Sequence, residues 1–270
     1  MQRHTLLLNG LSLELLESSG SGSPIFCCHG NSAAAAAFLP LFHTPLARQH
    51  RLLALSFPGH GGSAAAPDHY SIPALGELAA RVIRHLGLAR PLLVGHSLGG
   101  HALLEASHLL TGAAGLMLIS APPLSLGTLA DAFKPDPTDG ALFGGALTPE
   151  AVNTLARCFL ATPPAVATLA QVRADICATD PAFRPALLAS LQSGQLRDEW
   201  QALAAWPAPL ALLQGSADAF LQGDYFSRVP ATRLWGGGPQ QFDGCGHALH
   251  LEAPQRLAQL LARFAACCLE

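Results

Sequence analysis

The segment Gly95-His96-Ser97-Leu98-Gly99 is the feature that most restricts how this chain can fold. It stands between the short apolar run Leu92–Val94 and the helix-like stretch Leu98–Leu110. Glycines on both sides of the serine permit a turn from strand to helix that is too tight for larger side chains. The segment therefore predicts a buried strand, a sharp turn and a helix, with Ser97 strained, exposed and a candidate nucleophile.

Short apolar runs alternate with helical patterns along most of the chain. Runs that end at turn-forming residues predict strands at 25–28, 51–56, 92–95, 116–120 and 210–214, with a further strand at 232–235. Helices are expected at 33–48, 74–88 and 98–110, the first of them broken near Pro40 and Pro45. This alternation predicts an α/β fold with a mostly parallel sheet.

Both ends of the chain carry clear local signals. Asn9-Gly10 separates the apolar runs 5–8 and 11–17, which is the strongest short-range signal for a β-hairpin. Pro254 suits a first helical position, and apolar residues follow at helical spacing: Leu257, Leu260, Leu261 and Phe264. We expect an antiparallel hairpin that leads into the sheet and an amphipathic terminal helix.

The stretch 122–206 is helical in pattern and rich in proline. Thr148-Pro149-Glu150 is a good helix start, with threonine as the N-cap and proline in the first turn. We expect 122–206 to form a helical insert over one end of the sheet, and 1–121 with 207–270 to form the core.

Two sets of side chains in this insert bear on function. Apolar residues that can line it, mostly as core, are Leu142, Phe143, Leu147, Val152, Leu155, Phe159 and Leu160. A surplus of such residues would favour an apolar substrate group. Its arginines are spread out and are expected to be solvated surface charges: Arg157, Arg173, Arg184 and Arg197.

Composition excludes several classes of protein. Of 270 residues, 50% are hydrophobic and 12% charged, which suits a chain with a full core and excludes a disordered one. The net charge is −3, and the sequence has no basic run and no basic stripe interleaved with aromatic residues, so a nucleic acid is not expected as the main partner. No apolar run reaches the ~20 residues of a membrane span, and the run Leu6–Leu8 is too short for a signal peptide. We expect a cytoplasmic protein without membrane insertion.

The seven cysteines predict neither disulfides nor a metal site. Their number is odd, two pairs are adjacent in sequence, and no Cys-x-x-Cys occurs. They are Cys27, Cys28, Cys158, Cys177, Cys245, Cys267 and Cys268. Reduced, mostly buried thiols are expected, with no metal and no cofactor.

A serine needs a base to become a nucleophile, and that base is usually a histidine held by a carboxylate. Among 12 histidines, His247 stands out because it ends the glycine-rich segment Gly244–His247 before the terminal helix. His250 is its nearest competitor. The sequence therefore favours His247 as the base.

Asp218 is the best candidate for the carboxylate. It follows the predicted strand 210–214, at the carboxyl end where sites of open α/β sheets form. Asp224 and Asp243 are alternatives.

The order Ser97, Asp218, His247 in these contexts resembles the α/β-hydrolase superfamily over nearly the whole chain. Further segments resemble family motifs: His29–Ser32 matches the His-Gly segment, Ser56–Ser63 matches D-x-P-G-x-G-x-S, and Gly246–Pro254 matches G-H-x-x-x-x-E-x-P. One departure is Ser56, where the family usually has an aspartate that supports a loop. The insert lies where the family carries its lid.

The resemblance also implies an oxyanion hole, formed by the backbone N–H groups of Asn31 and Leu98. The helix that begins at Leu98 would add a positive dipole end. The Ser32 side chain is a further candidate donor, whereas His29 and His96 are expected to be structural.

Family members that open epoxides or remove halide have aspartate in place of Ser97, so those reactions are not expected. The favoured function is hydrolysis of a small, largely apolar carboxylic ester through an acyl-enzyme at Ser97. Alternatives on the same triad are a lactonase, a thioesterase, a carbon–carbon bond hydrolase or a cofactor-free haloperoxidase. The carbon–carbon hydrolases usually have Trp soon after the histidine, where this chain has Ala248 and Leu249. A slow-turnover ligand receptor of the same fold is the alternative from a different class.

Overall fold

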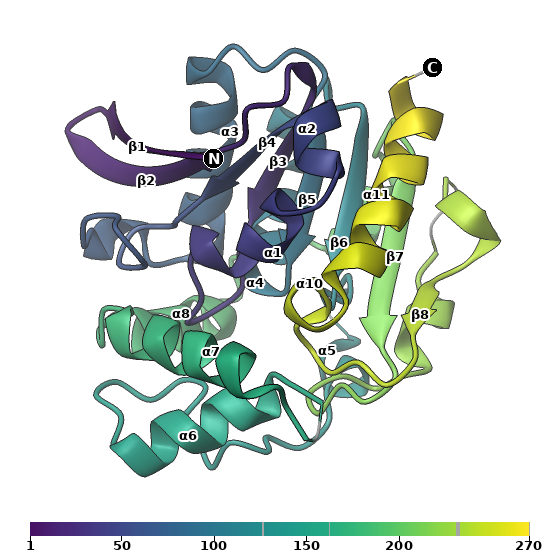
Figure 1. The fold of residues 1–270 in the computed structure, drawn as a ribbon. Helices are drawn as coiled ribbons and strands as arrows, with labels where there is room; N and C mark the ends of the chain where they lie inside the picture. Colours follow the sequence, from purple (N-terminus) through teal and green to yellow (C-terminus); the bar gives the residue numbers. More distant parts are fainter. Residues whose placement is uncertain (126, 162, 231–232, 270) are drawn as a thin grey trace.

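An eight-stranded sheet crosses the molecule in the order β1-β2-β4-β3-β5-β6-β7-β8 (Figure 1). The structure is a computed structural model, and it describes residues 1–125, 127–161, 163–230 and 233–269. The strands are β1 Gln2–Leu8, β2 Leu11–Glu17, β3 Gly22–Cys28, β4 His50–Leu55, β5 Leu92–His96, β6 Gly115–Ile119, β7 Leu210–Gly215 and β8 Gln240–Phe242. The β1–β2 hairpin is antiparallel and joins β4 antiparallel, whereas β4 to β8 pair in parallel. The predicted α/β fold with its N-terminal hairpin is confirmed.

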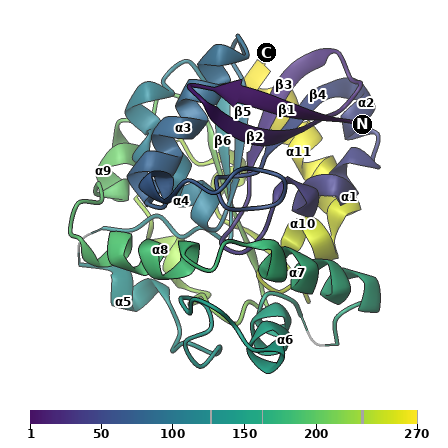
Figure 2. The same ribbon diagram turned by 90° about the vertical axis from the view of Figure 1, so that its left-hand side faces the viewer.

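Helices cover both faces of this sheet (Figure 2). One face carries α3 (Ile72–His85) and α4 (Leu98–Glu105). The other carries α1 (Leu39–Phe42), α2 (Leu46–Gln49), α10 (Leu249–Glu252) and α11 (Pro254–Leu269). The central strands are apolar on both sides because each face packs on helices.

The helix expected at 33–48 is divided more than predicted. The chain forms a 3-10 turn at Ala35–Phe38 and then the single-turn helices α1 and α2. Pro40 lies in the first turn of α1, and Pro45 precedes α2. Proline lacks the N–H that a continuous helix needs, which accounts for the division.

The strand expected at 232–235 is wrong over its described part. Leu234 forms only an isolated bridge with Leu210, and Thr232 lies outside the described residues. The glycines at 236 and 237 take positive φ values of 75° and 76°, and the chain turns there before β8. The edge strand is therefore β8, which begins at Gln240, eight residues after the expected start at 232.

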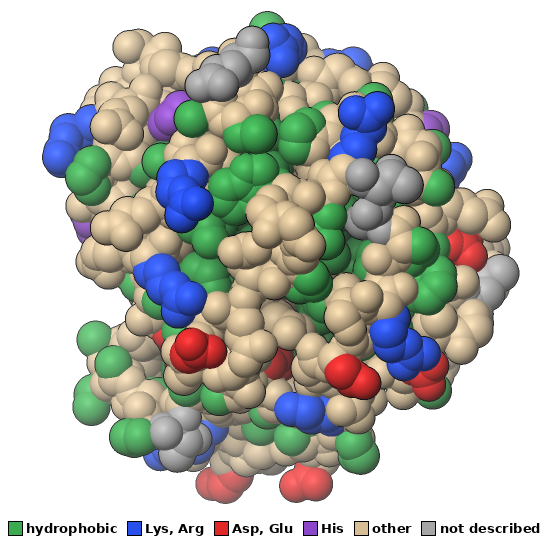
Figure 3. Space-filling view, turned by 90° about the vertical axis from the view of Figure 1, so that its right-hand side faces the viewer, with side chains coloured by type: hydrophobic (Ala, Val, Ile, Leu, Met, Phe, Trp, Pro, Cys, Tyr) green, Lys and Arg blue, Asp and Glu red, His purple; other side chains and the backbone are tan. Residues whose placement is uncertain are grey.

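The β8 side of the molecule is shown in Figure 3, where hydrophobic side chains gather in the middle and Lys and Arg side chains lie around them. The guanidinium of Arg256 lies 4.2 Å from the Phe242 ring centroid, and that of Arg263 lies 5.8 Å from Trp235. Cations on α11 thus cover aromatic rings near the sheet edge. No helix in the described ranges is both long and apolar enough to span a bilayer.

Between β6 and β7 the described residues form helices α5 Leu129–Ala132, α6 Pro149–Cys158, α7 Val166–Ala178, α8 Phe183–Gln192 and α9 Glu199–Ala204. Helices α6, α7 and α8 lie beyond the carboxyl ends of the strands (Figures 1 and 2). The Thr148 hydroxyl accepts a hydrogen bond from Ala151 N at 3.2 Å, so the predicted start of α6 is confirmed.

All seven cysteines are free thiols. Four of them are buried, while Cys177 and Cys267 are exposed.

Candidate active site

Ser97 lies at the sharp turn between β5 and α4. Its φ of 48° and ψ of −119° are strained for a residue with a side chain. A Cβ on Gly95 would lie 2.5 Å from Gly100 Cα, and a Cβ on Gly99 would collide with the Cys28 carbonyl. Both flanking glycines are therefore required by close backbone packing, as the sequence predicts.

A buried aspartate–histidine pair stands close to this turn. His247 Nδ1 lies 2.7 Å from Asp218 Oδ2, and the other carboxylate oxygen accepts from Phe220 N at 2.8 Å and Leu221 N at 3.3 Å. Burial alone would raise the pKa of Asp218, but the imidazole and these N–H groups outweigh it and lower the pKa. Ionised Asp218 accepts the hydrogen on Nδ1, which leaves Nε2 of neutral His247 as a proton acceptor.

The neighbours of Ser97 bring its turn close to His247. Nε2 of His96, the residue before Ser97, donates to the His247 carbonyl at 3.0 Å, and the two rings lie 5.1 Å apart. The Phe220 ring lies 5.0 Å from the His247 ring, and Phe220 and Ser97 line the same cavity. Segments at the ends of β5, β7 and β8 thus converge at one point.

The alternative candidates for the base and the carboxylate lie in different surroundings from His247 and Asp218. Asp224 and Asp243 are exposed. His250 is buried beside His96 at a ring distance of 4.4 Å, and burial lowers its pKa to about 3. Within the described part of the chain, His250 has no carboxylate hydrogen-bonded to it. Of these candidates, the structure pairs only Asp218 with His247.

Among the described residues, the backbone N–H groups of Asn31 and Leu98 have no hydrogen-bond acceptor. Both residues line the cavity that contains Ser97. The side chain of Ser32 is already engaged, because its hydroxyl donates to Asn31 Oδ1 at 3.1 Å. Ser32 also has a positive φ of 58°.

A mostly apolar cavity of about 380 Å³ opens at Ser97. Its apolar walls are Ile72, Leu98, Leu124, Phe133, Leu142, Phe143, Leu187, Leu188, Leu191 and Phe220. Among the apolar insert residues named from the sequence, Leu142 and Phe143 line it, whereas Val152, Leu155, Phe159 and Leu160 are buried core. The cavity has the size and lining of a small-molecule site.

Besides Asn31 and Ser97, four polar side chains border this cavity: His101, Lys134, Asp136 and Gln192. His101 Nδ1 lies 2.8 Å from Glu199 Oε1. Burial by itself would lower the pKa of His101, but the carboxylate raises it above its usual value. The Lys134 ammonium donates to the Asp218 carbonyl at 2.5 Å. A bound molecule therefore meets a few hydrogen-bonding groups in an apolar pocket.

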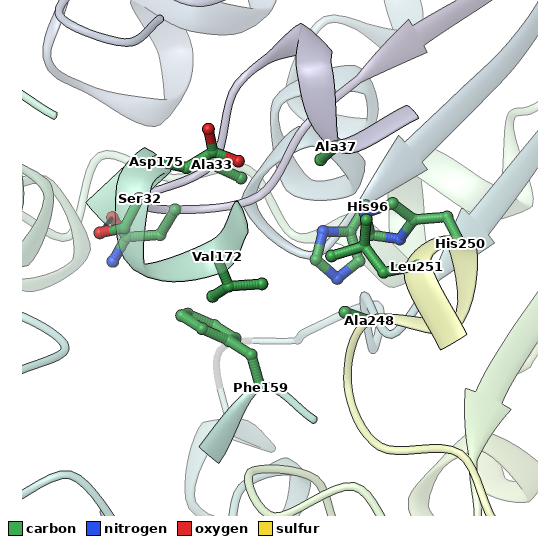
Figure 4. A pocket seen from close by; sticks show the side chains of 11 residues that line it. Ser32, Ala33, Ala37, His96, Phe159, Val172, Asp175, Ala248, His250 and Leu251 are labelled. Atoms are coloured by element: carbon green, nitrogen blue, oxygen red, sulfur yellow. Dashed lines mark hydrogen bonds between the residues drawn. The ribbon is translucent and has the colours of Figure 1, made fainter. Parts of the chain in front are cut away.

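A second, much smaller cavity lies between α7 and α10 (Figure 4). Phe159 and Val172 border it on one side, and His96 and His250 lie together on another. Its volume is about 20 Å³, and one water needs roughly 10–15 Å³ on this measure. It is too small for a substrate, so the larger cavity is the candidate substrate site. Across the described ranges no group of three or more His, Cys, Asp or Glu residues is arranged to hold a metal ion.

Glu252 in α10 holds the loop that carries His247. Its carboxylate accepts from Gly246 N at 2.7 Å and from Ala161 N at 2.6 Å, so it also joins this loop to the segment after α6. Glu252, which matches the glutamate of the family motif, therefore stabilises the loop next to the candidate base.

Glu252→Gln is expected to destabilise the fold by about 1–3 kcal/mol, because an amide replaces one carboxylate oxygen and leaves a partly buried N–H without an acceptor. Urea denaturation measures the change. Glu150→Gln, at an exposed position of α6, is the control and should be nearly neutral. Equal stability of both variants and the unmodified chain would contradict the assigned task.

Glu14 is a residue that sequence reasoning missed. Ser56 Oγ donates to Glu14 Oε2 at 2.7 Å, and Gly62 N donates to the same oxygen at 3.0 Å. A carboxylate from β2 thus supports the loop in which the family usually has its own aspartate. The available signal was a charged residue flanked by two leucines, Leu13 and Leu15, within the run 11–17.

The mostly parallel sheet, the serine at a strained strand-to-helix turn and the buried Asp–His pair together define the class of α/β-hydrolases. The model of the alpha/beta hydrolase family matches residues 25–260. The chain belongs to this family and is a hydrolase of the α/β fold.

Solved structures include close structural neighbours. N-acyl homoserine lactonase AidH, in complex with N-hexanoyl homoserine lactone, is 28% identical with a TM-score of 0.92, over 99% of this chain and 98% of that chain. A thermophilic esterase from Thermogutta terrifontis is 19% identical with a TM-score of 0.79, over 99% of each chain, which supports the fold alone.

One curated relative is similar along most of the chain. The dihydrolipoyllysine-residue acetyltransferase component of the acetoin cleaving system of Pseudomonas putida is 25% identical over 261 residues. These cover 95% of this chain and 67% of that protein.

Proposed function

We propose that this chain hydrolyses a carboxylic ester bond, with Ser97 as nucleophile, His247 as general base and Asp218 as the residue that orients it. The observation that carries the proposal is the 2.7 Å hydrogen bond between Asp218 and His247 next to a serine at a strained turn. The mostly apolar cavity of about 380 Å³ beside Ser97 favours a substrate with an apolar acyl or alcohol group.

In the first half of the reaction, His247 Nε2 takes the proton of Ser97 as its oxygen attacks the ester carbonyl. The N–H groups of Asn31 and Leu98 would hold the resulting oxyanion, with support from the N-terminal end of α4. Protonated His247 then gives its proton to the leaving alkoxide, and an acyl-enzyme remains on Ser97. Asp218 stabilises the imidazolium throughout.

In the second half, His247 takes a proton from a water that attacks the acyl carbonyl, and the carboxylic acid leaves as Ser97 recovers its proton. We further propose that residues 122–206 act as a lid on a core of 1–121 and 207–270. Support comes from the cavity walls, because Phe133, Leu142 and Leu187 of this segment line the same pocket as Ser97. Such a lid would exclude bulk water from the acyl-enzyme.

A second candidate substrate is a lactone of the N-acyl homoserine type. It is favoured by the 0.92 TM-score to AidH, which was solved with N-hexanoyl homoserine lactone. A lactone is a cyclic ester, so the same steps would open the ring. His101 and Gln192 at the cavity wall are suitable partners for the amide of such a substrate.

Turnover of 4-nitrophenyl esters from acetate to laurate, and of N-hexanoyl homoserine lactone, tests the proposal. We expect measurable turnover and a loss of at least about 10³-fold in Ser97→Ala, because the nucleophile is removed. The best chain length would report how much of the cavity the acyl group fills. Turnover that persists in Ser97→Ala would contradict the proposal. A folded, inactive parent protein would favour the thioesterase, carbon–carbon hydrolase, haloperoxidase or receptor alternatives.

A further inference from the structure

Arg184 in α8 is the buried cation of the insert. The sequence predicts a solvated surface charge at this position, and that prediction is wrong, since Arg184 is 2% exposed. The spacing of arginines could not reveal this, because burial depends on the contact between α8 and the loop after β3. A buried guanidinium is costly unless its hydrogens and charge are matched.

The partners of Arg184 are neutral oxygens. Its Nε donates to Ser32 Oγ at 2.8 Å, and its terminal nitrogens donate to Gly145 O at 3.1 Å and Ile176 O at 2.6 Å. Asp175, on the neighbouring α7, accepts from Gln171 at 2.9 Å instead. In the described part of the chain, no Asp or Glu forms an ion pair with Arg184. Its positive charge is therefore not neutralised by a direct ion pair among the described residues.

A chain of hydrogen bonds joins Arg184 to Asn31. Arginine can only donate, so the Ser32 hydroxyl accepts from Arg184 and must direct its own hydrogen elsewhere. It donates to Asn31 Oδ1 at 3.1 Å, and Asn31 Nδ2 then donates to Leu142 O at 2.9 Å. Each donor group in this series of hydrogen bonds has one acceptor. Arg184 therefore directs the Ser32 hydroxyl hydrogen toward Asn31 and so fixes the orientation of the Asn31 side-chain amide.

These hydrogen bonds hold a strained stretch of backbone in place. Ser32 has a φ of 58°, a value that non-glycine residues adopt only when their surroundings hold them. The N–H of Asn31, the residue before Ser32, is one of the two candidate oxyanion donors, and among the described residues it has no acceptor. Asn31 is bonded directly to Ser32, so a shift of Ser32 would move the Asn31 Cα and, with it, the Gly30–Asn31 peptide that carries this N–H.

We propose that Arg184 is a positioning residue for ester hydrolysis, which fixes the Asn31 N–H through Ser32 and adds positive potential where the oxyanion develops. This inference rests on the proposed function. An N–H aimed at the oxyanion interacts most strongly in the transition state, so its loss should lower kcat more than it raises KM.

The test compares Arg184→Met and Ser32→Ala with the unmodified enzyme. We expect kcat for the best ester to fall about 10- to 100-fold in Arg184→Met, with KM changed less than about threefold. Ser32→Ala should change kcat in the same direction by a smaller factor. Arg184→Lys, which keeps the charge but has fewer donors, should recover part of the loss.

Ser190→Ala is the matched control. Ser190 is also buried in α8, and its hydroxyl accepts from Ile72 N at 3.1 Å, so the variant loosens α8 without touching Asn31. It should lower the melting temperature and leave kcat unchanged. An equal loss of kcat in Ser190→Ala and Arg184→Met would overturn the inference, because the effect would then be general loosening of α8.

A second readout does not depend on the substrate. A fluorophosphonate reacts with an activated serine through a charged transition state at phosphorus, which the same N–H groups would stabilise. Its rate of reaction at Ser97 should fall in Arg184→Met in parallel with kcat. If the unmodified enzyme reacts with the probe but cleaves no ester or lactone, the proposed substrate class fails, and the probe still measures the effect of Arg184.

Two further outcomes would overturn the inference. One is a folded Arg184→Met with unchanged kcat and probe rate. The other applies if Arg184→Met does not fold: a Ser32→Ala variant with unchanged kcat and probe rate.

Discussion

Asp218→Asn is expected to lower kcat about 10⁴-fold with little change in the fold. The Oδ1 atom would keep its bonds from Phe220 N and Leu221 N, so the asparagine NH₂ group would face His247 Nδ1. Nδ1 would then have to accept a hydrogen bond, and the imidazole hydrogen would move to Nε2. His247 in that tautomer cannot take the Ser97 proton.

Steady-state kinetics on the best ester, with thermal unfolding to check the fold, measure this effect. Asp224→Asn and Asp243→Asn are matched controls, because both aspartates are exposed, and they should keep near-normal turnover. If Asp218→Asn keeps near-normal turnover and one of the two controls loses it, the role of orienting His247 belongs to the aspartate replaced in that control.

Acid is expected to unfold this protein over a narrow range below pH 6.5. Four buried histidines have lowered pKa values because burial disfavours their charged form: His29 at about 4, His250 at about 3, and His60 and His96 well below the usual 6.5. Rings lie close together in this cluster, as His29–His60 at 4.9 Å and His96–His250 at 4.4 Å. Any charge on one ring would therefore repel charge on its neighbour.

The sign of this change in stability follows from the number of protons that the folded and unfolded chains bind. Between pH 6.5 and about 4, the unfolded chain binds a proton at each of these histidines and the folded chain does not, so stability falls as pH falls. Each pH unit costs about 1.4 kcal/mol per histidine, or on the order of 5 kcal/mol for the four together at pH 5.5. That is comparable with the whole stability of a typical domain, about 5–15 kcal/mol.

Four groups act in the opposite direction. Glu199 raises the pKa of His101, and burial raises the pKa of Asp175 to about 6 and the pKa values of Glu105 and Glu252 above their usual 4.5, so all four favour the folded state as pH falls. The two glutamates ordinarily titrate below about pH 5, so from pH 7.5 to 5 the four histidines act mainly against His101 and Asp175 and determine the sign. Urea denaturation from pH 7.5 to 5 should show the net loss, and His250→Phe should reduce the slope by about a quarter. A constant free energy of unfolding over this range would contradict the expectation.

The fold and the proposed triad could be predicted because their signals are local. A glycine on each side of Ser97, Asn-Gly between two strands and Pro254 before an apolar stripe each define a turn or helix start within a few residues. The overall arrangement of the strands was then expected from the resemblance of these segments to α/β-hydrolase motifs. The pairing of Asp218 with His247 was a hypothesis that the 2.7 Å contact fits.

Other features depend on contacts between distant segments, which no local pattern records. Arg184 looks like an ordinary helix charge, and only the approach of α8 to Ser32 buries it. Glu14 reaches Ser56 across 42 positions of the chain. The position of β8 was missed because glycine turns after Leu234 delay the last strand, and glycine specifies a turn without fixing its direction.

Lys134, the single lysine of the chain, touches the Asp218 carbonyl at the wall of the substrate cavity. Apart from the terminal amine, it is the one primary amine that an acylating dye, a crosslinker or an activated resin could modify. Amine coupling would thus fix the protein by the wall of its own pocket, beside the carboxylate that is hydrogen-bonded to His247. A fluorophore at this amine would respond to whatever occupies the cavity, while attachment to a support is better directed to the exposed thiol of Cys267 at the far end of α11.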